Sequence, residues 1–128
     1  MLDNEGLSRA ATDRAMYIRL QAAYLDGRRV VTSAAILAEA LRGSPRDAGV
    51  YRILHGVVVE PVSQEIGERA GQLIGAAGLG SGQAVDAILV ATALREPGPI
   101  VIATSDLGDL TALVGDEKRV SVVAADKL

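Results

Sequence analysis

The chain has 128 residues, of which 49% are apolar, and it carries a formal net charge of −3 at pH 7. This balance is typical of a globular domain, and it excludes a global positive field that would attract nucleic acid. The sequence has no cysteine, which excludes disulfide scaffolds, thiolate zinc sites and cysteine nucleophiles. The longest apolar run, residues 87–94, is far shorter than the roughly 20 residues that span a bilayer. Since the first ten residues also lack a signal-peptide pattern, we expect a cytoplasmic protein with no membrane partner.

The first half of the chain is predicted to consist of helices and short strands. Apolar residues at helical spacing predict one amphipathic helix from residue 7 to residue 25. The residues of this apolar stripe are Leu7, Ala11, Ala15, Ile18, Ala22 and Leu25. The elements predicted next are a strand over 30–33, a helix over 34–43, a short helix over 44–56 and a strand over 57–62. Ser33 is the expected N-cap of the helix over 34–43, and Gly43 its expected end.

The second half continues the same alternation. An amphipathic helix is predicted over 63–78, with Ser63 as its N-cap. The helix predicted over 84–96 is apolar on nearly every side. The other predicted elements are a loop over 79–83, a turn over 97–99, a strand over 100–104, a short helix over 106–114 and a last strand over 119–125.

Short apolar strands that alternate with helices indicate an α/β fold with a mostly parallel central sheet and helices on both faces. The length favours a single domain over residues 1–128. Such sheets place their sites at the carboxyl ends of the strands. Acidic residues near those ends are therefore the first candidates for a functional site.

Asp86 is the only charged residue between Ala84 and Leu94. A helix that is apolar all round is expected to be buried all round. A buried carboxylate is costly unless it is paired, hydrogen-bonded or bound to a metal. The alternative is a first-turn position where the helix dipole stabilises the charge and the backbone is partly hydrated.

Glu39 stands alone in the same way, as the only charged residue of the stretch 33–41. It lies one turn after Ala35 and Ile36, on or beside the face that we expect to be buried. The alternative is an exposed ion pair with Arg42, three residues further along the helix.

Three aspartates stand near predicted strand ends. Asp106 comes just after the strand over 100–104, although aspartate is also a common N-cap. Asp109 lies in the first turn of the next helix, where acidic residues are common without a function. Asp3 stands at the carboxyl end of a strand if Leu2 belongs to one, and the alternative is a frayed terminus.

These acids form a pattern that is stronger than any one of its members. Each stands at a strand end or in a helix that follows a strand, and together they are Asp3, Glu39, Asp86, Asp106 and Asp109. Carboxylates that gather at one place repel one another and raise their own pKa values. A divalent cation removes this conflict, and oxygen ligands without histidine or cysteine suit Mg²⁺ or Mn²⁺.

Four segments carry a resemblance to a known family. They are LDNEGL (2–7), TSAAILAEALRG (32–43), VDAILVATA (85–93) and VIATSDLGDL (101–110). In order and spacing they resemble the four acidic motifs of PIN-domain ribonucleases, and most closely those of the VapC-type toxins of bacterial toxin–antitoxin pairs. The resemblance covers nearly the whole chain and implies a PIN-like three-layer α/β/α sandwich. Only two apolar residues precede the first aspartate, so the first strand is expected to be short.

This resemblance implies a metal-dependent endoribonuclease that cleaves RNA phosphodiester bonds with Mg²⁺ or Mn²⁺. The metal-binding acids that it implies are Asp3, Glu39, Asp86 and Asp106. Asp109 would be an additional catalytic acid, and Thr104 and Ser105 match hydroxyl positions that orient the cluster. The candidates for guiding the RNA backbone are Arg9, Arg14, Arg42 and Arg46. Toxins of this type form homodimers and are held by a cognate antitoxin protein that covers the acidic site.

Two other functions stay open. A catalytically silent PIN-like module would act only by binding partners. A receiver-type phosphorylation domain is also α/β with an acidic pocket, but it needs a phosphoacceptor aspartate at the end of its third strand. Glu60 stands near the corresponding place in this chain, which disfavours the receiver.

Overall fold

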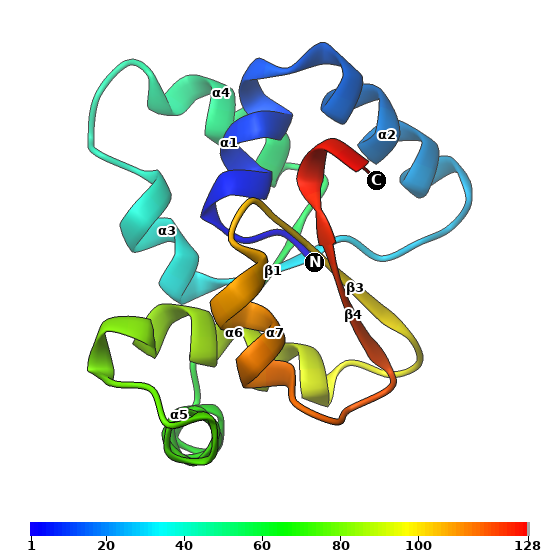
Figure 1. Cartoon of the computed structure of the whole chain (residues 1–128). Helices are drawn as coiled ribbons and strands as arrows, with labels where there is room; N and C mark the ends of the chain where they lie inside the picture. Colours follow the sequence, from blue (N-terminus) through cyan, green and yellow to red (C-terminus); the bar gives the residue numbers. More distant parts are fainter. Residues whose placement is uncertain (128) are drawn as a thin grey trace.

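Short parallel strands and the helices that connect them make up residues 1–127, which a computed structural model of the chain describes (Figure 1). The helices are α1 (Asn4–Thr12), α2 (Arg14–Leu25), α3 (Ala34–Ala40), α4 (Asp47–Leu54), α5 (Gln64–Ala77), α6 (Ala84–Arg95) and α7 (Leu107–Val114). The strands are β1 (Val31–Ser33), β2 (Val58–Glu60), β3 (Ile100–Thr104) and β4 (Val120–Ala124). Two single turns of 3₁₀-helix are η1 (Ser81–Gln83) and η2 (Ala125–Lys127). This arrangement confirms the predicted α/β class.

Leu2 joins two pairs of parallel strands. β1 pairs with β2, and β3 pairs with β4. Leu2 forms a parallel bridge with Ala103 of β3, and its amide donates a hydrogen bond of 3.0 Å to the carbonyl of Val31 in β1. The strands therefore lie side by side in the order β2, β1, Leu2, β3, β4. Figure 1 shows the first residues of the chain between β1 and β3. The strand that the sequence predicts at Leu2 is present only as this single bridge.

Asp13 interrupts the helix predicted over 7–25. Its backbone is extended (φ −109°, ψ 115°), and its side chain accepts a hydrogen bond of 2.9 Å from the amide of Ala15. An aspartate that caps a new helix offers the backbone an alternative to continuing the old one. The prediction of one helix is therefore wrong, and α1 and α2 take its place.

The break at Asp13 also changes which side chains are buried. Met16 and Leu20 of α2 enter the core, whereas the exposed fractions of Ile18 and Leu25 are 54% and 89%. Both exposed residues belong to the predicted apolar stripe. After Asp13, α2 starts in a new direction. Helical spacing counted from Leu7 therefore does not predict which face of α2 is buried.

The remaining elements lie close to their predicted bounds. Ser33 and Ser63 cap α3 and α5 through their hydroxyl groups, as predicted. The predicted helix over 34–43 is shorter in the structure, since Leu41 is already extended (φ −101°, ψ 145°). No helix of residues 1–127 is long and apolar enough to cross a membrane.

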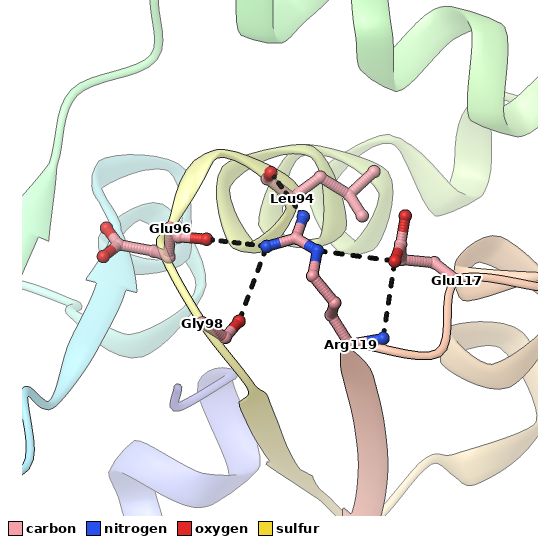
Figure 2. A network of polar contacts seen from close by, with 5 residues as sticks. All are labelled: Leu94, Glu96, Gly98, Glu117 and Arg119. Carbon is pink, nitrogen blue, oxygen red and sulfur yellow. Dashed lines mark hydrogen bonds and ion pairs between the residues drawn. The ribbon is translucent and has the colours of Figure 1, made fainter.

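Arg119 closes the carboxyl end of α6, the helix whose first turn carries Asp86. Its guanidinium donates hydrogen bonds to the carbonyl oxygens of Leu94 (3.1 Å), Glu96 (3.1 Å) and Gly98 (3.4 Å), as Figure 2 shows. Its Nε also lies 3.5 Å from Oε1 of Glu117. The last carbonyl groups of a helix have no partner within it. Arg119, just before β4, binds one of them at Leu94 and two carbonyls of the following turn, so it ties the end of α6 to the sheet.

Gly6 lets α1 lie against β3. A Cβ atom at this position would lie 2.9 Å from the carbonyl oxygen of Ala103 and 3.2 Å from a side-chain methyl of Leu2. Only a residue without a side chain fits so close to a backbone oxygen. This approach brings the first turn of α1 to the carboxyl end of β3.

Replacing Gly6 by alanine should lower the free energy of unfolding by about 1–3 kcal/mol, because the new Cβ forces α1 away from β3. The matched control is Gly67→Ala in α5, where nothing lies within 4 Å of the added Cβ. That change should instead raise the free energy of unfolding by about 0.5–1 kcal/mol. Urea unfolding followed by circular dichroism measures both. A Gly6→Ala protein as stable as the unmodified chain would contradict the close approach.

Candidate functional site

Three aspartates from two neighbouring helices meet at one place. Asp86 lies in the first turn of α6, Asp106 precedes α7, and Asp109 lies in the first turn of α7. One carboxylate oxygen from each lies within 4.8 Å of those of the other two. The packing of α6 against α7 therefore brings together residues that are 20 or more positions apart in the sequence.

Asp106 occupies the N-cap position of α7, but its carboxylate accepts no hydrogen bond from that helix. Its amide instead donates a hydrogen bond of 2.9 Å to the hydroxyl of Thr104, which is fully buried at the end of β3. Thr104 thus holds the backbone at Asp106 and leaves the carboxylate of Asp106 available. Ser105, the other predicted hydroxyl, is exposed. The alternative of a simple N-cap aspartate does not describe Asp106.

Asp3 is buried, with 5% of its surface exposed. It caps α1, since its Oδ1 accepts a hydrogen bond of 2.8 Å from the amide of Gly6. Burial raises the pKa of Asp3, while hydrogen bonds from the side chain of Thr104 and from the amide of Gly6 act in the opposite direction. The alternative of a frayed terminus therefore does not apply to this residue.

Glu39 is exposed in the last turn of α3, and the expectation that it lies on or beside a buried face is wrong. The alternative of an ion pair with Arg42 is also absent among residues 1–127. The guanidinium of Arg42 donates to the carbonyl oxygens of Ala38 (2.9 Å) and Leu41 (2.8 Å) instead. Arg42 thus stabilises the end of α3 and leaves the carboxylate of Glu39 without a basic partner.

The pKa of Asp86 responds to the charges of the other four predicted acids. The pKa of Asp86 is raised to about 6, and burial is the largest cause. The negative charges that raise it further are those of Asp3, Glu39, Asp106 and Asp109. Asp86 itself is half-buried in the first turn of α6. This matches the first-turn alternative, whereas an apolar helix by itself predicts full burial. The first turn of α6 lies at the edge of the core, which explains the difference.

The group of carboxylates within 4.8 Å of one another does not include Asp3 or Glu39, whose charges nevertheless act on Asp86. By the acidic site we mean the three clustered aspartates together with these two acids. None of the ion pairs among residues 1–127 involves any of the five. Carboxylate oxygens without histidine or cysteine form the donor set that Mg²⁺ and Mn²⁺ prefer. A divalent cation therefore fits these residues.

The sequence gives little sign of two residues that shape the backbone next to the acidic segments. Gly6 allows the approach of α1 to β3, and only its place three residues after Asp3 marks it. Asp47 begins α4, and it is buried although it stands between arginine and alanine in a polar stretch. Neither shows a periodicity that would distinguish it from a surface residue.

Comparisons with known proteins support the fold. No model of a known protein family matches the chain, and no curated protein matches it. Among solved structures, the chain is similar to one chain of the crystal structure of VapBC2 from Rickettsia felis bound to a DNA fragment from their promoter. The TM-score is 0.69, the sequence identity is 12%, and the match covers 97% of this chain and 96% of that one. The two chains therefore share a fold over nearly their whole length.

In EDTA, Asp86→Asn should stabilise the protein at pH 7, and the gain should shrink as the pH falls from about 6 towards 4. The pKa of Asp86 is raised on folding, so the folded state binds the proton more tightly, and ionisation removes stability as the pH rises through this window. Urea unfolding at pH 4 and pH 7 measures the difference. Asp26→Asn, at an exposed position after α2, is the control. A gain of equal size at both pH values would contradict the raised pKa.

Proposed function

We propose that the chain is a metal-dependent endoribonuclease, a VapC-type toxin with a PIN-like three-layer α/β/α sandwich. The observation that carries this proposal is the cluster of Asp86, Asp106 and Asp109, whose carboxylate oxygens lie within 4.8 Å of one another. The charges of Asp3 and Glu39 also act on Asp86. Asp3 and Asp106 follow Leu2 and β3, and Glu39 lies in the helix after β1, so the site is at the carboxyl ends of the strands. This is where parallel sheets hold their ligands.

The shared fold with a chain of VapBC2 supports the same proposal. It agrees with the resemblance of the four sequence motifs to those of VapC-type toxins. On this basis we propose a cognate antitoxin protein as a partner that covers the acidic site, and a homodimer as the active assembly.

Within this proposal, Asp3, Glu39, Asp86 and Asp106 would hold Mg²⁺ or Mn²⁺. When bound, the ion supplies a water of lowered pKa and neutralises charge on the phosphodiester oxygens. Asp109 lies close to Asp86 and Asp106, and it would accept the proton of the attacking water. Thr104 keeps Asp106 in place through the backbone.

The four arginines that could guide the RNA differ in whether their guanidinium groups already have partners. Arg9 pairs with Asp13 (3.2 Å), and the guanidinium of Arg42 is bound to carbonyl oxygens. Arg14 and Arg46 form no ion pair within residues 1–127. We therefore propose Arg14 and Arg46 before the other two as contacts for the RNA backbone.

Asp86→Asn should abolish binding of Mn²⁺ in isothermal titration calorimetry and cleavage of RNA in the presence of Mn²⁺. The change removes the charge at the centre of the acidic site while keeping the shape of the side chain. Asp26→Asn should bind and cleave as the unmodified protein does. If the unmodified protein binds no Mn²⁺, the metal-dependent nuclease is wrong and the silent partner-binding module takes its place.

Expression of the chain without an antitoxin should arrest bacterial growth, and expression of Asp86→Asn at the same level should not. The difference follows because the variant keeps the fold but loses the metal. Colony counts after induction, with protein levels checked by immunoblot, measure the effect. Growth arrest by both proteins would show that the effect does not depend on nuclease activity.

A further inference from the structure

A buried carboxylate outside the acidic site holds the loop between α3 and α4. Asp47, the first residue of α4, has 9% of its surface exposed. The amide of Arg42 donates to both of its oxygens (3.2 Å to Oδ1 and 3.1 Å to Oδ2), and the amide of Gly43 donates to Oδ2 (2.7 Å). Hydrogen bonds to a charged acceptor are stronger than those between neutral groups. The loop is thus closed through its backbone.

This loop begins directly after the helix that carries Glu39. α3 has only seven residues, and the chain leaves the helix at Leu41. A helix of this length is marginal without support from its surroundings. The guanidinium of Arg42 binds the carbonyls of Ala38 and Leu41, and the amide of Arg42 is bound by Asp47. Arg42 and Asp47 therefore decide together where the last turn of α3, with Glu39, comes to lie.

Asp47 is itself attached to the part of the molecule that carries Asp3. α4 packs against α1, the helix that Asp3 caps. The two helices approach closely, since a Cβ at Gly49 would lie 3.5 Å from the Cβ of Ala11. The hydrogen bonds of Asp47 thus connect the end of α3 to the α1–α4 pair, and they connect the position of Glu39 to that of Asp3.

Glu39 depends on this support more than the other acids do. Asp3 is buried and hydrogen-bonded, and Asp86 and Asp109 lie in first turns of helices that pack on each other. Glu39 is exposed and pairs with no basic residue among residues 1–127. α3 packs against α6, the helix of Asp86, so the path of the α3 backbone sets where the carboxylate of Glu39 lies.

We propose that Asp47 is a positioning residue for Glu39, which it holds at the acidic site through the backbone amides of Arg42 and Gly43. Asp47 itself would not touch the metal. The inference rests on the proposed function, since it concerns the ion that the acidic site would bind. It adds a residue from outside the four acidic segments to the groups on which metal binding depends.

The test is Asp47→Asn, which keeps the size of the side chain and replaces one acceptor oxygen with an NH₂ group. In metal-free protein, hydrogen exchange at Arg42, at Gly43 and in the last turn of α3 should become faster. In the calorimeter, the affinity for Mn²⁺ should fall about tenfold, the low end for groups that orient a metal ligand. The matched control is Asp13→Asn, which alters an aspartate that also binds a backbone amide but caps α2. It should leave Mn²⁺ affinity unchanged.

A double-mutant cycle separates positioning from general loss of stability. Glu39→Gln should weaken Mn²⁺ binding by itself, and adding Asp47→Asn to it should change the affinity little further. If Asp47→Asn lowers the affinity for Mn²⁺ by the same factor in the unmodified protein and in Glu39→Gln, the proposal is overturned. Asp47 would then act on the site without Glu39. Gly43→Ala is a second variant if Asp47→Asn does not fold, since φ of +72° at Gly43 strains any other residue in the same turn.

The outcomes distinguish this inference from the function on which it rests. If the unmodified protein binds no Mn²⁺, the proposed function is wrong. If it binds Mn²⁺ and Asp47→Asn binds equally well, only the role of Asp47 is overturned. Faster exchange around α3 together with weaker, Glu39-dependent binding of Mn²⁺ would support the proposal.

Discussion

The constraint on which the structure depends is a group of carboxylates at the start of α6 and α7 that form no ion pairs among the described residues. Asp86, Asp106 and Asp109 come within 4.8 Å of one another, and the charges of Asp3 and Glu39 act on Asp86. None of these five acids forms an ion pair among the described residues. Their mutual repulsion and the burial of Asp86 act against folding, as the raised pKa of Asp86 shows. The surrounding fold therefore has to hold these carboxylates in place against their repulsion.

The fold holds these acids mainly through its backbone. Asp3 is fixed by capping α1, and Asp106 by the hydroxyl of Thr104 beneath it. Arg119 binds the far end of α6, and Asp47 binds the turn that follows α3. Arg42 and Arg119 bind backbone carbonyl oxygens, and Arg9 pairs with Asp13. The carboxylates of the acidic site therefore form no ion pair within the described part of the chain.

The same kind of local interaction explains where periodicity misleads. Asp13 and Asp47 both accept hydrogen bonds from backbone amides, and both change the path of the chain. Asp13 divides a stretch whose apolar spacing favours one helix, so that Ile18 and Leu25 of the predicted stripe are exposed. Hydrophobic spacing describes an average preference, whereas a single carboxylate that binds the backbone decides the conformation at one position.

The sequence alone determined the α/β class and, apart from the break at Asp13, the order of helices and strands, because apolar periodicity is a local property that can be read from neighbouring residues. It also indicated that Asp86 and Glu39 are unusual, since each is the only charge in an apolar stretch. The tertiary structure alone decided that Asp86, Asp106 and Asp109 come within 4.8 Å, that Glu39 is exposed, and that Arg42 binds carbonyls and leaves Glu39 unpaired. Gly6 and Asp47 became visible only in the folded chain. Distances between segments depend on how helices pack and on which backbone groups a side chain reaches, and no pattern within one segment contains that information.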